Sequence, residues 1–585
     1  MRELDVPGRS GAAVPAPALR GWPMTRTAVR ALLWLLLSAA VAPYFLGLGD
    51  SSIWDANEAF YVETPREMLE SGDYASPTFN YEPRLNKPVL SYWIVAAFYK
   101  VFGVSVGVQR FSIALGAMVI IAVAFFLTRA AYPEAGALRS PARVDAALWA
   151  AVGMAITPRL LMFSRRIFID VYITMFMALT LLFFALAERY PAHRRVLLAL
   201  MYVSIGLGVL TKGPVAVVLP ALAFAVYLAL RRELHRIPAL MIPAGILIVL
   251  AIVVPWYAVL YARHGWTYIA SFFLGENVAR YTEGYGVDSV RGPFFYLPVL
   301  LSDSFPWSAF LFASAAADWR ARRSTAADDR VTRLRTLLWS WIGVIVVFFS
   351  LSAAKQDLYI FPVVPAVAAL AGIAVARGLA GEARAAAAVR LTALIIGALV
   401  ALAAAGVVYL FRAGGSGYAL EGVLLIGAAG IVGGLVTAGL AASSRLRAAM
   451  LMIVVTFVAL NWVFVLRVLP SFEAYKPVPG FARALAPRLT PDAVVATYDE
   501  ALPSLVFYLR RQVQQFFEED RFIALVRSER PVFAVLSREN YAAMAEQLAS
   551  TCIIERRPTF DVKLKNVLAR APLPELVLIA NRCPR

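Results

Sequence analysis

The sequence is short of the residues that many enzymes use for metal and redox chemistry. Its 585 residues include only two cysteines and three histidines. Two of the histidines, His193 and His235, lie in arginine-rich segments between apolar runs. The chain has no glycine-rich dinucleotide fingerprint, no P-loop, no internal repeats and no low-complexity tract. Nothing in it therefore indicates a soluble catalytic domain or a bound nucleotide.

Most of the chain is made up of apolar residues instead. Hydrophobic residues make up 60% of the chain and charged residues 16%, whereas soluble domains contain about 45–50% apolar residues. The mean hydropathy is +0.69. These values predict a polytopic membrane protein. The net charge of +18 would suit a nucleic-acid partner, but basic membrane proteins usually carry such charge in their cytoplasmic loops, so we expect no nucleic acid.

Apolar runs of about 20 residues are long enough to cross a bilayer and predict about thirteen spans here. The spans are expected near 27–48, 108–130, 144–161, 170–187, 196–211, 214–230, 237–260, 292–316, 336–352, 358–377, 388–411, 419–442 and 448–468. An odd number places the two ends of the chain on opposite sides. The apolar run 88–103 is expected to lie in the membrane interface, because a further span there would invert every loop after it.

Arginine-rich loops fix the orientation. They contain Arg129, Arg139 and Arg143; Arg189, Arg194 and Arg195; Arg231, Arg232 and Arg236; six arginines in 320–335; Arg377, Arg384 and Arg390; and Arg445 and Arg447. All fall on one side, which the positive-inside rule makes cytoplasmic. The first span lacks a convincing cleavage site and is expected to be retained as an anchor. Residues 1–469 then form a transmembrane domain with external loops 49–107 and 261–291.

Residues 470–585 are expected to form an external α/β domain. VVATYD, PVFAVLS and NVLARAP read as strands, and LPSLVFYLRR and NYAAMAEQLA read as helices. Both cysteines, Cys552 and Cys583, lie in this domain. An oxidising compartment would allow them to pair, but the sequence alone leaves their pairing open.

The first external loop concentrates carboxylates. Thr64-Pro65-Arg66-Glu67 matches a capping box with proline at the first helical position, and it predicts a helix that Gly72 closes. Asp55 and Glu58 precede this cap and could share one face of a helical turn. Such carboxylates suit base or electrostatic catalysis at the membrane surface. The structural alternative is a simple stop signal beside the first span.

Cationic and polar side chains recur in five external segments. They are Tyr81, Arg84 and Lys87; Arg165, Arg166 and Asp170; Lys212; Glu276 and Arg280; and Lys355 and Tyr359. Charges at the ends of spans are costly and usually functional, and arginine and lysine suit phosphate. The pattern predicts a site for phosphate substrates. Lipid headgroup binding without chemistry for Arg84 and Lys87, and a structural ion pair between Asp170 and a neighbouring arginine, are the alternatives.

These motifs, taken in order, resemble a known family. The order is W-D-x-x-E at Trp54–Glu58, continuing to Asp73; Lys87-Pro88; Asp170; Thr211-Lys212-Gly213; Pro306-Trp307; and Ala354-Lys355 with Tyr359. It resembles the membrane glycosyltransferases of the GT-C fold, and among them the bacterial 4-amino-4-deoxy-L-arabinose lipid A transferases, relatives of the protein O-mannosyltransferases. The resemblance implies an α-helical polytopic membrane protein of about 13 transmembrane helices with a small C-terminal periplasmic α/β domain.

The resemblance also implies a function. It is that of an enzyme of the bacterial inner membrane that takes an aminosugar from undecaprenyl phosphate and attaches it to a lipid A phosphate at the periplasmic face. Such transfer gives resistance to polymyxin and cationic antimicrobial peptides. Asp55 would be the catalytic carboxylate. Many relatives carry Asp-Glu where this chain has Asn57-Glu58, so Glu58 is an alternative, and Asp170 would complete the catalytic set.

The remaining site residues would bind substrate or a metal ion. The resemblance places the departing phosphate on Arg84, Lys87, Lys212, Lys355 and Tyr359, with Tyr81, Arg165, Arg166, Glu276 and Arg280 completing the pocket. No cofactor is required by this chemistry. Some members of the fold use a divalent ion, and His264 with Glu82 could hold zinc; a surface histidine without a role is the simpler alternative.

Two other functions stay open at this point. The protein could glycosylate a protein or another envelope polymer with the same donor. It could instead be a non-enzymatic carrier of polyprenyl-linked lipids. A carrier is expected to place charges near mid-membrane in paired inverted halves, whereas the charges here gather at one face. The sequence therefore favours an enzyme.

Overall fold

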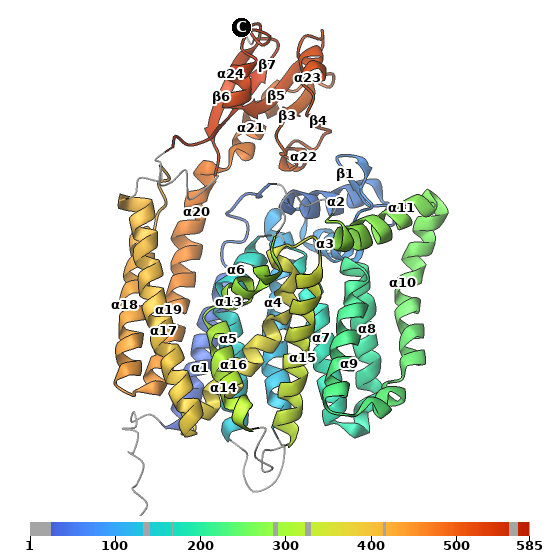
Figure 1. Ribbon diagram of the computed structural model, residues 1–585. Helices are drawn as coiled ribbons and strands as arrows, with labels where there is room; N and C mark the ends of the chain where they lie inside the picture. The colour runs from blue at the N-terminus through green and yellow to red at the C-terminus, as the bar shows by residue number, and fades with distance from the viewer. Residues whose placement is uncertain are drawn as a thin grey trace, which may run out of the picture.

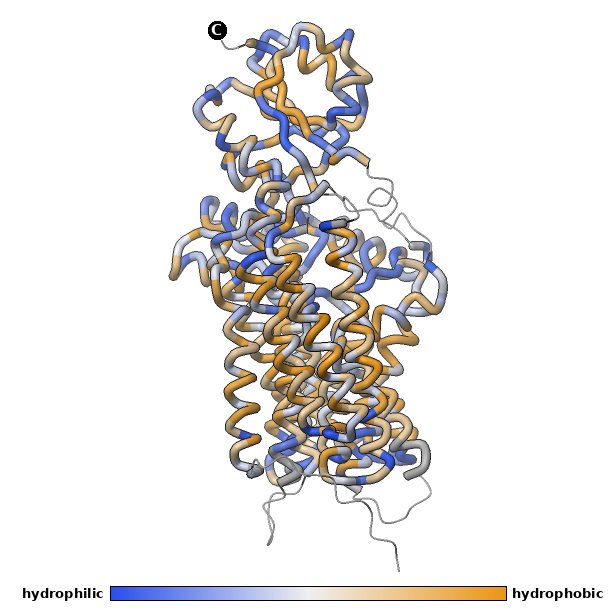
Figure 2. Tube along the Cα trace, turned by 90° about the vertical axis from the view of Figure 1, so that its left-hand side faces the viewer, coloured by the Kyte–Doolittle hydropathy of each residue, from blue (hydrophilic) through white to orange (hydrophobic). Residues whose placement is uncertain are grey.

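The computed structural model describes residues 25–55, 57–132, 141–166, 168–284, 291–321, 329–413, 417–560 and 571–583. Long helices form an upright bundle, and a small α/β domain sits on one end of it (Figure 1). We call this end of the bundle the domain end. Figure 2 shows hydrophobic residues along the middle of the bundle and hydrophilic segments concentrated at its two ends.

The bundle accounts for the predicted spans. Its helices are α1 (Arg26–Val41), α4 (Val106–Ala130), α5 (Pro141–Ala155), α6 (Pro158–Arg165), α7 (Asp170–Arg189), α8 (Arg194–Lys212), α9 (Val215–Leu230), α10 (Ile242–His264), α13 (Tyr296–Asp303), α14 (Phe310–Ala321), α15 (Asp329–Leu351), α16 (Val364–Leu379), α17 (Ala383–Val408), α18 (Val423–Ala442) and α19 (Leu446–Val463). Within the described part of the chain, 10 helices are long and apolar enough to cross a membrane. The number of spans rises to 12 if each of two bent helix pairs counts as one span. The 16-residue α9 falls just short in length.

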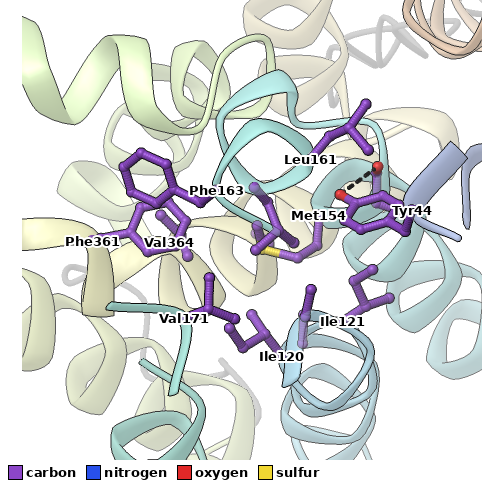
Figure 3. Packing of buried hydrophobic residues seen from close by; sticks show 14 of the residues in the cluster. Tyr44, Ile120, Ile121, Met154, Leu161, Phe163, Val171, Phe361 and Val364 are labelled. Carbon is purple, nitrogen blue, oxygen red and sulfur yellow. Dashed lines mark hydrogen bonds between the residues drawn. The ribbon is translucent and has the colours of Figure 1, made fainter. Parts of the chain in front are cut away.

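One predicted span, 144–161, is broken into α5 and α6, which meet at 52°. Pro158 begins α6 and supplies no backbone N–H, so carbonyls at the end of α5 lose their helical partners. The Tyr44 hydroxyl donates to the carbonyl of Ala155 at 3.1 Å (Figure 3), and the Asn461 amide donates to that of Ile156 at 3.2 Å. Satisfying these groups internally allows a break at membrane depth.

The packing around this break is tight and apolar. Figure 3 shows Met154 of α5 beside Tyr44, with Phe163 of α6 and Val364 of α16 on the other side of Met154 and Ile120 and Ile121 of α4 below. These side chains are buried. The break therefore lies inside the bundle, where packed side chains hold the two short helices in place of a continuous helical ladder.

The predicted span 292–316 is not straight. It consists of α13 and α14, which meet at 117° around Pro306. Proline ends a helix because its ring removes the N–H donor and clashes with the preceding turn. The predicted span is therefore bent rather than straight, and the residues involved are as apolar as predicted.

Loops that the positive-inside rule places on one side of the membrane lie together at the far end of the bundle. Arg236, in the turn after α9, donates to Glu188 of α7 at 2.7 Å. Arg333 of α15 donates to Glu233, also after α9, at 2.5 Å. These contacts put the ends of α7 and α9 and the beginning of α15 on the same side, opposite the α/β domain in Figure 1.

Short helices cover the domain end. They are α2 (Asn57–Ser71), α3 (Leu90–Phe102), α11 (Trp266–Ala270), a π-helix (Ser271–Ala279) and α12 (Arg280–Thr282), with the hairpin β1 (Thr78–Phe79) and β2 (Glu82–Pro83). The predicted interfacial run 88–103 contains α3. Its 13 residues span about 20 Å at about 1.5 Å per residue, well short of a bilayer core of about 30 Å. Figure 1 places it beside α2 under the α/β domain.

The α/β domain is built on a five-stranded sheet in the order β4-β3-β5-β7-β6. Its elements after α20 (Leu469–Ser471) are α21 (Pro477–Leu485), β3 (Val494–Tyr498), α22 (Ser504–Leu509), β4 (Gln514–Phe516), α23 (Glu519–Val526), β5 (Val532–Ser537), α24 (Arg538–Ala543), β6 (Cys552–Pro558) and β7 (Glu575–Ala580). β3 pairs in parallel with β4 and β5, and β7 pairs antiparallel with β5 and β6. Side chains from α21 and α22 cover one face of the sheet, and those from α23 cover the other.

The sequence predicted this domain in outline. Two of the expected strands and both expected helices are present as β3, β5, α22 and α24. The third expected strand, NVLARAP, begins within 561–570, outside the described residues. The antiparallel strands β6 and β7 were missed. Cys552 and Cys583 form a disulfide with a Cα–Cα distance of 5.6 Å, which resolves the open question of their pairing.

Candidate functional site

The site begins on α2, which is longer than the capping box predicts. α2 starts at Asn57 and contains Pro65 in its interior, so the prediction of a helix start at Thr64 is wrong. The Tyr61 carbonyl, which Pro65 leaves without its helical donor, accepts from the Gln109 side chain of α4 at 3.2 Å. A tertiary contact thus replaces the bond that proline removes. Gly72, at φ +72°, closes the helix as expected.

Two buried arginines hold the chain between the first span and α2. Arg165 donates to the carbonyls of Pro43 (2.7 Å), Leu46 (2.6 Å) and Gly47 (3.0 Å). Arg110 donates to the carbonyls of Leu48, Ser51 and Ser52 at 3.0, 2.5 and 2.9 Å. The predicted role of Arg165 in binding substrate is therefore not supported, because backbone carbonyls already take up its guanidinium.

Glu58 lies at the centre of a buried charge cluster. Its carboxylate accepts from the Trp54 amide at 3.1 Å, from Arg110 at 3.3 Å and from Arg166 at 3.4 Å. Only 1% of the residue is exposed. The Arg166 guanidinium also lies 5.2 Å from the centre of the Trp54 ring. Through these contacts Glu58 stabilises the folded loop from inside.

Asp55 makes its contacts with the α/β domain. One carboxylate oxygen accepts from the backbone N–H of Ser504 at 2.7 Å, and the other accepts from the Ser504 hydroxyl at 2.6 Å. Burial raises the pKa of Asp55 to about 6, and the Ser504 bonds oppose that rise. The carboxylate is ionised at neutral pH but close to its titration range, which suits an acid–base group.

A second group of charges joins two external loops. The Lys87 ammonium donates to Glu276 of the π-helix at 3.0 Å, and Arg280 of α12 lies 3.5 Å from the same carboxylate. Burial lowers the pKa of Lys87, Glu276 opposes this, and repulsion from Arg280 and Lys212 adds to it. Lys87 and Arg280 thus share one carboxylate, leaving an excess of positive charge that suits a phosphate.

The third group lies where two spans meet the surface. Asp170 is the first residue of α7 and Lys212 the last residue of α8, and they form an ion pair. Each charge has the sign that its helix end favours. The Lys212 ammonium lies 5.4 Å from the centre of the Tyr359 ring. The alternative pairing of Asp170 with a neighbouring arginine is therefore wrong, since its partner is Lys212.

Arg84 lies beside these groups among aromatic rings. Its guanidinium is stacked 3.7 Å from the centre of the Phe60 ring. Burial raises the pKa of both Tyr61 and Tyr92, and the positive charge of Arg84 opposes that rise. The Nε atom of Arg84 and the Oδ1 atom of Asn86 are buried and have no hydrogen-bond partner among the described residues. Buried polar groups are normally paired, so these atoms are available to a ligand.

Lys355 and Tyr81, two other predicted site residues, bond to groups outside the three sets of charges. Lys355 is buried and donates to the Ser352 carbonyl in its own turn. The Tyr81 hydroxyl donates to the Arg510 carbonyl of the α/β domain at 3.1 Å. The backbone of the Lys355 turn nevertheless borders the site, because the Ala353 N–H donates to the Tyr281 carbonyl at 2.7 Å.

The expected zinc ligands do not come together. His264 contacts the Ser76 hydroxyl at 2.8 Å, whereas Glu82 accepts from Gln512 of the α/β domain at 3.2 Å. Across the described ranges, no group of three or more His, Cys, Asp or Glu side chains could hold a metal ion. The residues present do not fit a zinc site at this place.

Sequence reasoning missed two residues of the site. Arg110 could have been found, because an arginine near the end of an apolar run is costly and usually functional. Ser504 carried no signal, since a serine at the start of a short helix is common. Ser504 matters because Asp55, from a distant part of the chain, lies against it in the fold.

The chain is similar to known membrane glycosyltransferases. Residues 32–269 match the family of dolichyl-phosphate-mannose-protein mannosyltransferases. An uncharacterised protein of Aquifex aeolicus is 30% identical over 338 residues, which are 57% of this chain and 62% of that protein. Undecaprenyl phosphate-alpha-4-amino-4-deoxy-L-arabinose arabinosyl transferase 2 of Pseudomonas fluorescens is 29% identical over 375 residues, which are 64% of this chain and 61% of that protein. The matches thus span about three fifths of the length of these curated relatives.

A solved structure matches almost the whole chain. The crystal structure of ArnT from Cupriavidus metallidurans bound to undecaprenyl phosphate has a TM-score of 0.75 and 22% sequence identity, covering 95% of this chain and all of that one. The apo structure of the same protein gives a TM-score of 0.73. The chain therefore has the GT-C fold of ArnT, and its predicted resemblance to the aminoarabinose transferases and their protein mannosyltransferase relatives is confirmed.

Proposed function

We propose that the protein is a glycosyltransferase that moves 4-amino-4-deoxy-L-arabinose from undecaprenyl phosphate to a phosphate of lipid A. The observation that carries the proposal is the convergence of Lys87, Lys212 and Arg280 around two carboxylates at the domain end. The relatives named for this donor and sugar, and a neighbour crystallised with undecaprenyl phosphate, support the choice of substrate. The site would face the periplasm of a bacterial inner membrane.

The reaction is a displacement at the anomeric carbon. A phosphate oxygen of the acceptor attacks this carbon, the bond to the donor phosphate oxygen breaks, and undecaprenyl phosphate leaves with the electron pair. The leaving group carries negative charge that Lys87, Lys212 and Arg280 would stabilise. Fixed cations in a partly buried site act more strongly than they would in water. Arg84 and Asn86, with their unpartnered buried atoms, would contact the donor headgroup.

Asp55 would act on the nucleophile or the sugar. The acceptor phosphate is largely ionised near neutral pH, so little proton removal is needed. Asp55 would orient the acceptor or stabilise positive charge that develops on the sugar ring. None of these steps is assigned to a metal ion, because His264 and Glu82 bond to other partners.

Mass spectrometry of lipid A tests the proposal. Lipid A from a host that lacks its own transferase but makes the donor should gain aminoarabinose when the chain is expressed, and polymyxin resistance should rise with it. The Lys212→Gln variant, expressed to the same level in the membrane, serves as the matched comparison and should give less of both. Unmodified lipid A would contradict the proposed acceptor.

A second acceptor class follows from the mannosyltransferase family match. In that case lipid A would stay unmodified while a protein or another envelope polymer gained the sugar. Purified protein with undecaprenyl-phosphate aminoarabinose would still release undecaprenyl phosphate when given that acceptor. A carrier would give no covalent product with any acceptor.

A further inference from the structure

The α/β domain contacts the first external loop in two places. At residues 80–82, the Asn80 amide donates to the Val513 carbonyl at 2.9 Å and its Oδ1 accepts from the Val513 N–H at 2.8 Å. At residues 51–55, the Ile53 N–H donates to the Tyr508 hydroxyl at 3.0 Å, beside the bonds of Ser504 to Asp55. The loop that carries the candidate catalytic carboxylate is therefore held from both sides.

The contact at Asp55 differs from the others in what it fixes. Both oxygens of the carboxylate accept from one residue, at 2.7 and 2.6 Å, so the plane and direction of the carboxylate are set. Ser504 is fully buried. It lies at the start of α22, whose Leu505 and Val506 pack into the core of the α/β domain. The donors are thus attached to a rigid element rather than to a mobile loop.

Two charged side chains act on Asp55. Glu58, on α2, repels it, and Lys476, which precedes α21, attracts it. Lys476 is itself bound to Glu473 at 2.7 Å and lies 4.4 Å from the centre of the Trp54 ring. Because Lys476 is largely engaged by Glu473, the Ser504 donors are the direct hydrogen-bonding partners of the carboxylate.

We propose that Ser504 is a positioning residue, through which the α/β domain orients the Asp55 carboxylate for sugar transfer. The inference rests on the proposed function for its kinetic consequences, but the contact itself can be measured without it. In this view the α/β domain completes the active site. A bundle without this domain would keep the cationic groups but leave Asp55 without its two donors.

The test compares Ser504→Ala with two control variants of the full-length protein in detergent or nanodiscs. Ser504→Ala removes the hydroxyl donor and keeps the backbone donor. Asn80→Ala weakens the same interface at its other contact. Ser537→Ala removes a helix cap of α24 within the same domain and controls for a general loss of domain stability.

Ser504→Ala should lower kcat about tenfold or more while leaving the KM for the donor unchanged, since a bond to a charged group is lost in a residue that does not touch donor. The hydroxyl favours the ionised form of Asp55, so its loss should move the acid limb of the pH–rate profile to higher pH. Ser504→Thr, which keeps a hydroxyl, should recover part of the rate. Asn80→Ala and Ser537→Ala should not move the limb.

A direct measurement separates this inference from the proposed function. The infrared band of the protonated Asp55 carboxyl, identified by its loss in Asp55→Asn, should titrate at higher pH in Ser504→Ala than in the parent protein. An unchanged titration in Ser504→Ala, or an equal shift in Asn80→Ala, would overturn the positioning role. A shift specific to Ser504→Ala in a protein that transfers no aminosugar would leave the contact established and refute the proposed function instead.

Discussion

Glu276 accepts a hydrogen bond from Lys87 at 3.0 Å, and the pair joins two external loops that are 189 residues apart in the chain. Arg280 approaches the same carboxylate from one helical turn away. Glu276 therefore holds two cations near each other without neutralising both. An anion entering this place meets a net positive charge that the protein has already positioned, so little rearrangement is needed to bind it.

This arrangement predicts the effect of removing single cations. Lys87→Gln or Lys212→Gln should weaken use of the donor about 10- to 150-fold, because a hydrogen bond to a charged group is worth about 1.5–3 kcal/mol. The measurement is kcat/KM for the donor together with binding of undecaprenyl phosphate. Lys100→Gln, on α3 and outside these groups, is the matched control. Parent-like donor affinity in both site variants would refute the anion site.

Substitutions of Asp55 and Glu58 should have different effects on the protein. Asp55→Asn keeps the shape and removes the charge, so turnover should fall sharply while donor binding persists. Glu58→Gln should mainly reduce stability, because Glu58 balances Arg110 and Arg166 inside the loop. Turnover, donor binding and melting temperature are measured on both variants. Full activity in Asp55→Asn with a stable but inactive Glu58→Gln would transfer the catalytic role to Glu58.

Arg110 should be among the most destabilising positions of the bundle. Arg110→Met removes the Arg110 bonds to Glu58 and to three backbone carbonyls in a buried place, and breaking a buried ion pair by removing one partner costs about 3–5 kcal/mol. Arg263→Gln breaks the exposed pair with Asp73 and should cost about 0.2–1 kcal/mol. Thermal unfolding in detergent checks both values. Equal melting temperatures for the two variants would show that Arg110 does not stabilise the segment between the first span and α2.

Chelation should leave activity unchanged. His264 is bonded to Ser76, and Glu82 is bonded to Gln512, so these residues are not arranged to hold zinc. Dialysis of the purified protein against EDTA, followed by transfer assays with and without added zinc, tests this expectation. A loss of activity that zinc restores, and that His264→Gln reproduces, would reinstate the metal site.

The topology can be tested with reporters. A reporter fused after Arg585 should be external, and one inserted within 317–335 should be cytoplasmic. The ion pairs of Glu188 and Glu233 with Arg236 and Arg333 place the end of α9 and the beginning of α15 on one side, which is consistent with this prediction. Both reporters on the same side of the membrane would contradict the thirteen-span reading.

Sequence by itself determined the membrane class, most of the span positions and the residue types of the site. It could do so because spans depend on local apolar composition, and because a charge at the end of a span is conspicuous wherever it lies. Asp170 and Lys212 were found as charges at the ends of spans, and Lys87, Glu276 and Arg280 as charges in external loops; the structure joins them in ion pairs at the domain end.

Only the tertiary structure decided what each charge does. Arg165 and Arg166 are neighbours of the same type, yet Arg165 bonds to three carbonyls and Arg166 reaches Glu58. Pro65 reads as a helix start, but Gln109 supplies the missing donor and the helix begins at Asn57. Asp55 meets Ser504 across 449 residues of chain. Local sequence carries no information on such partners, because hydrogen bonds and ion pairs depend on distances that only the packing of distant segments sets.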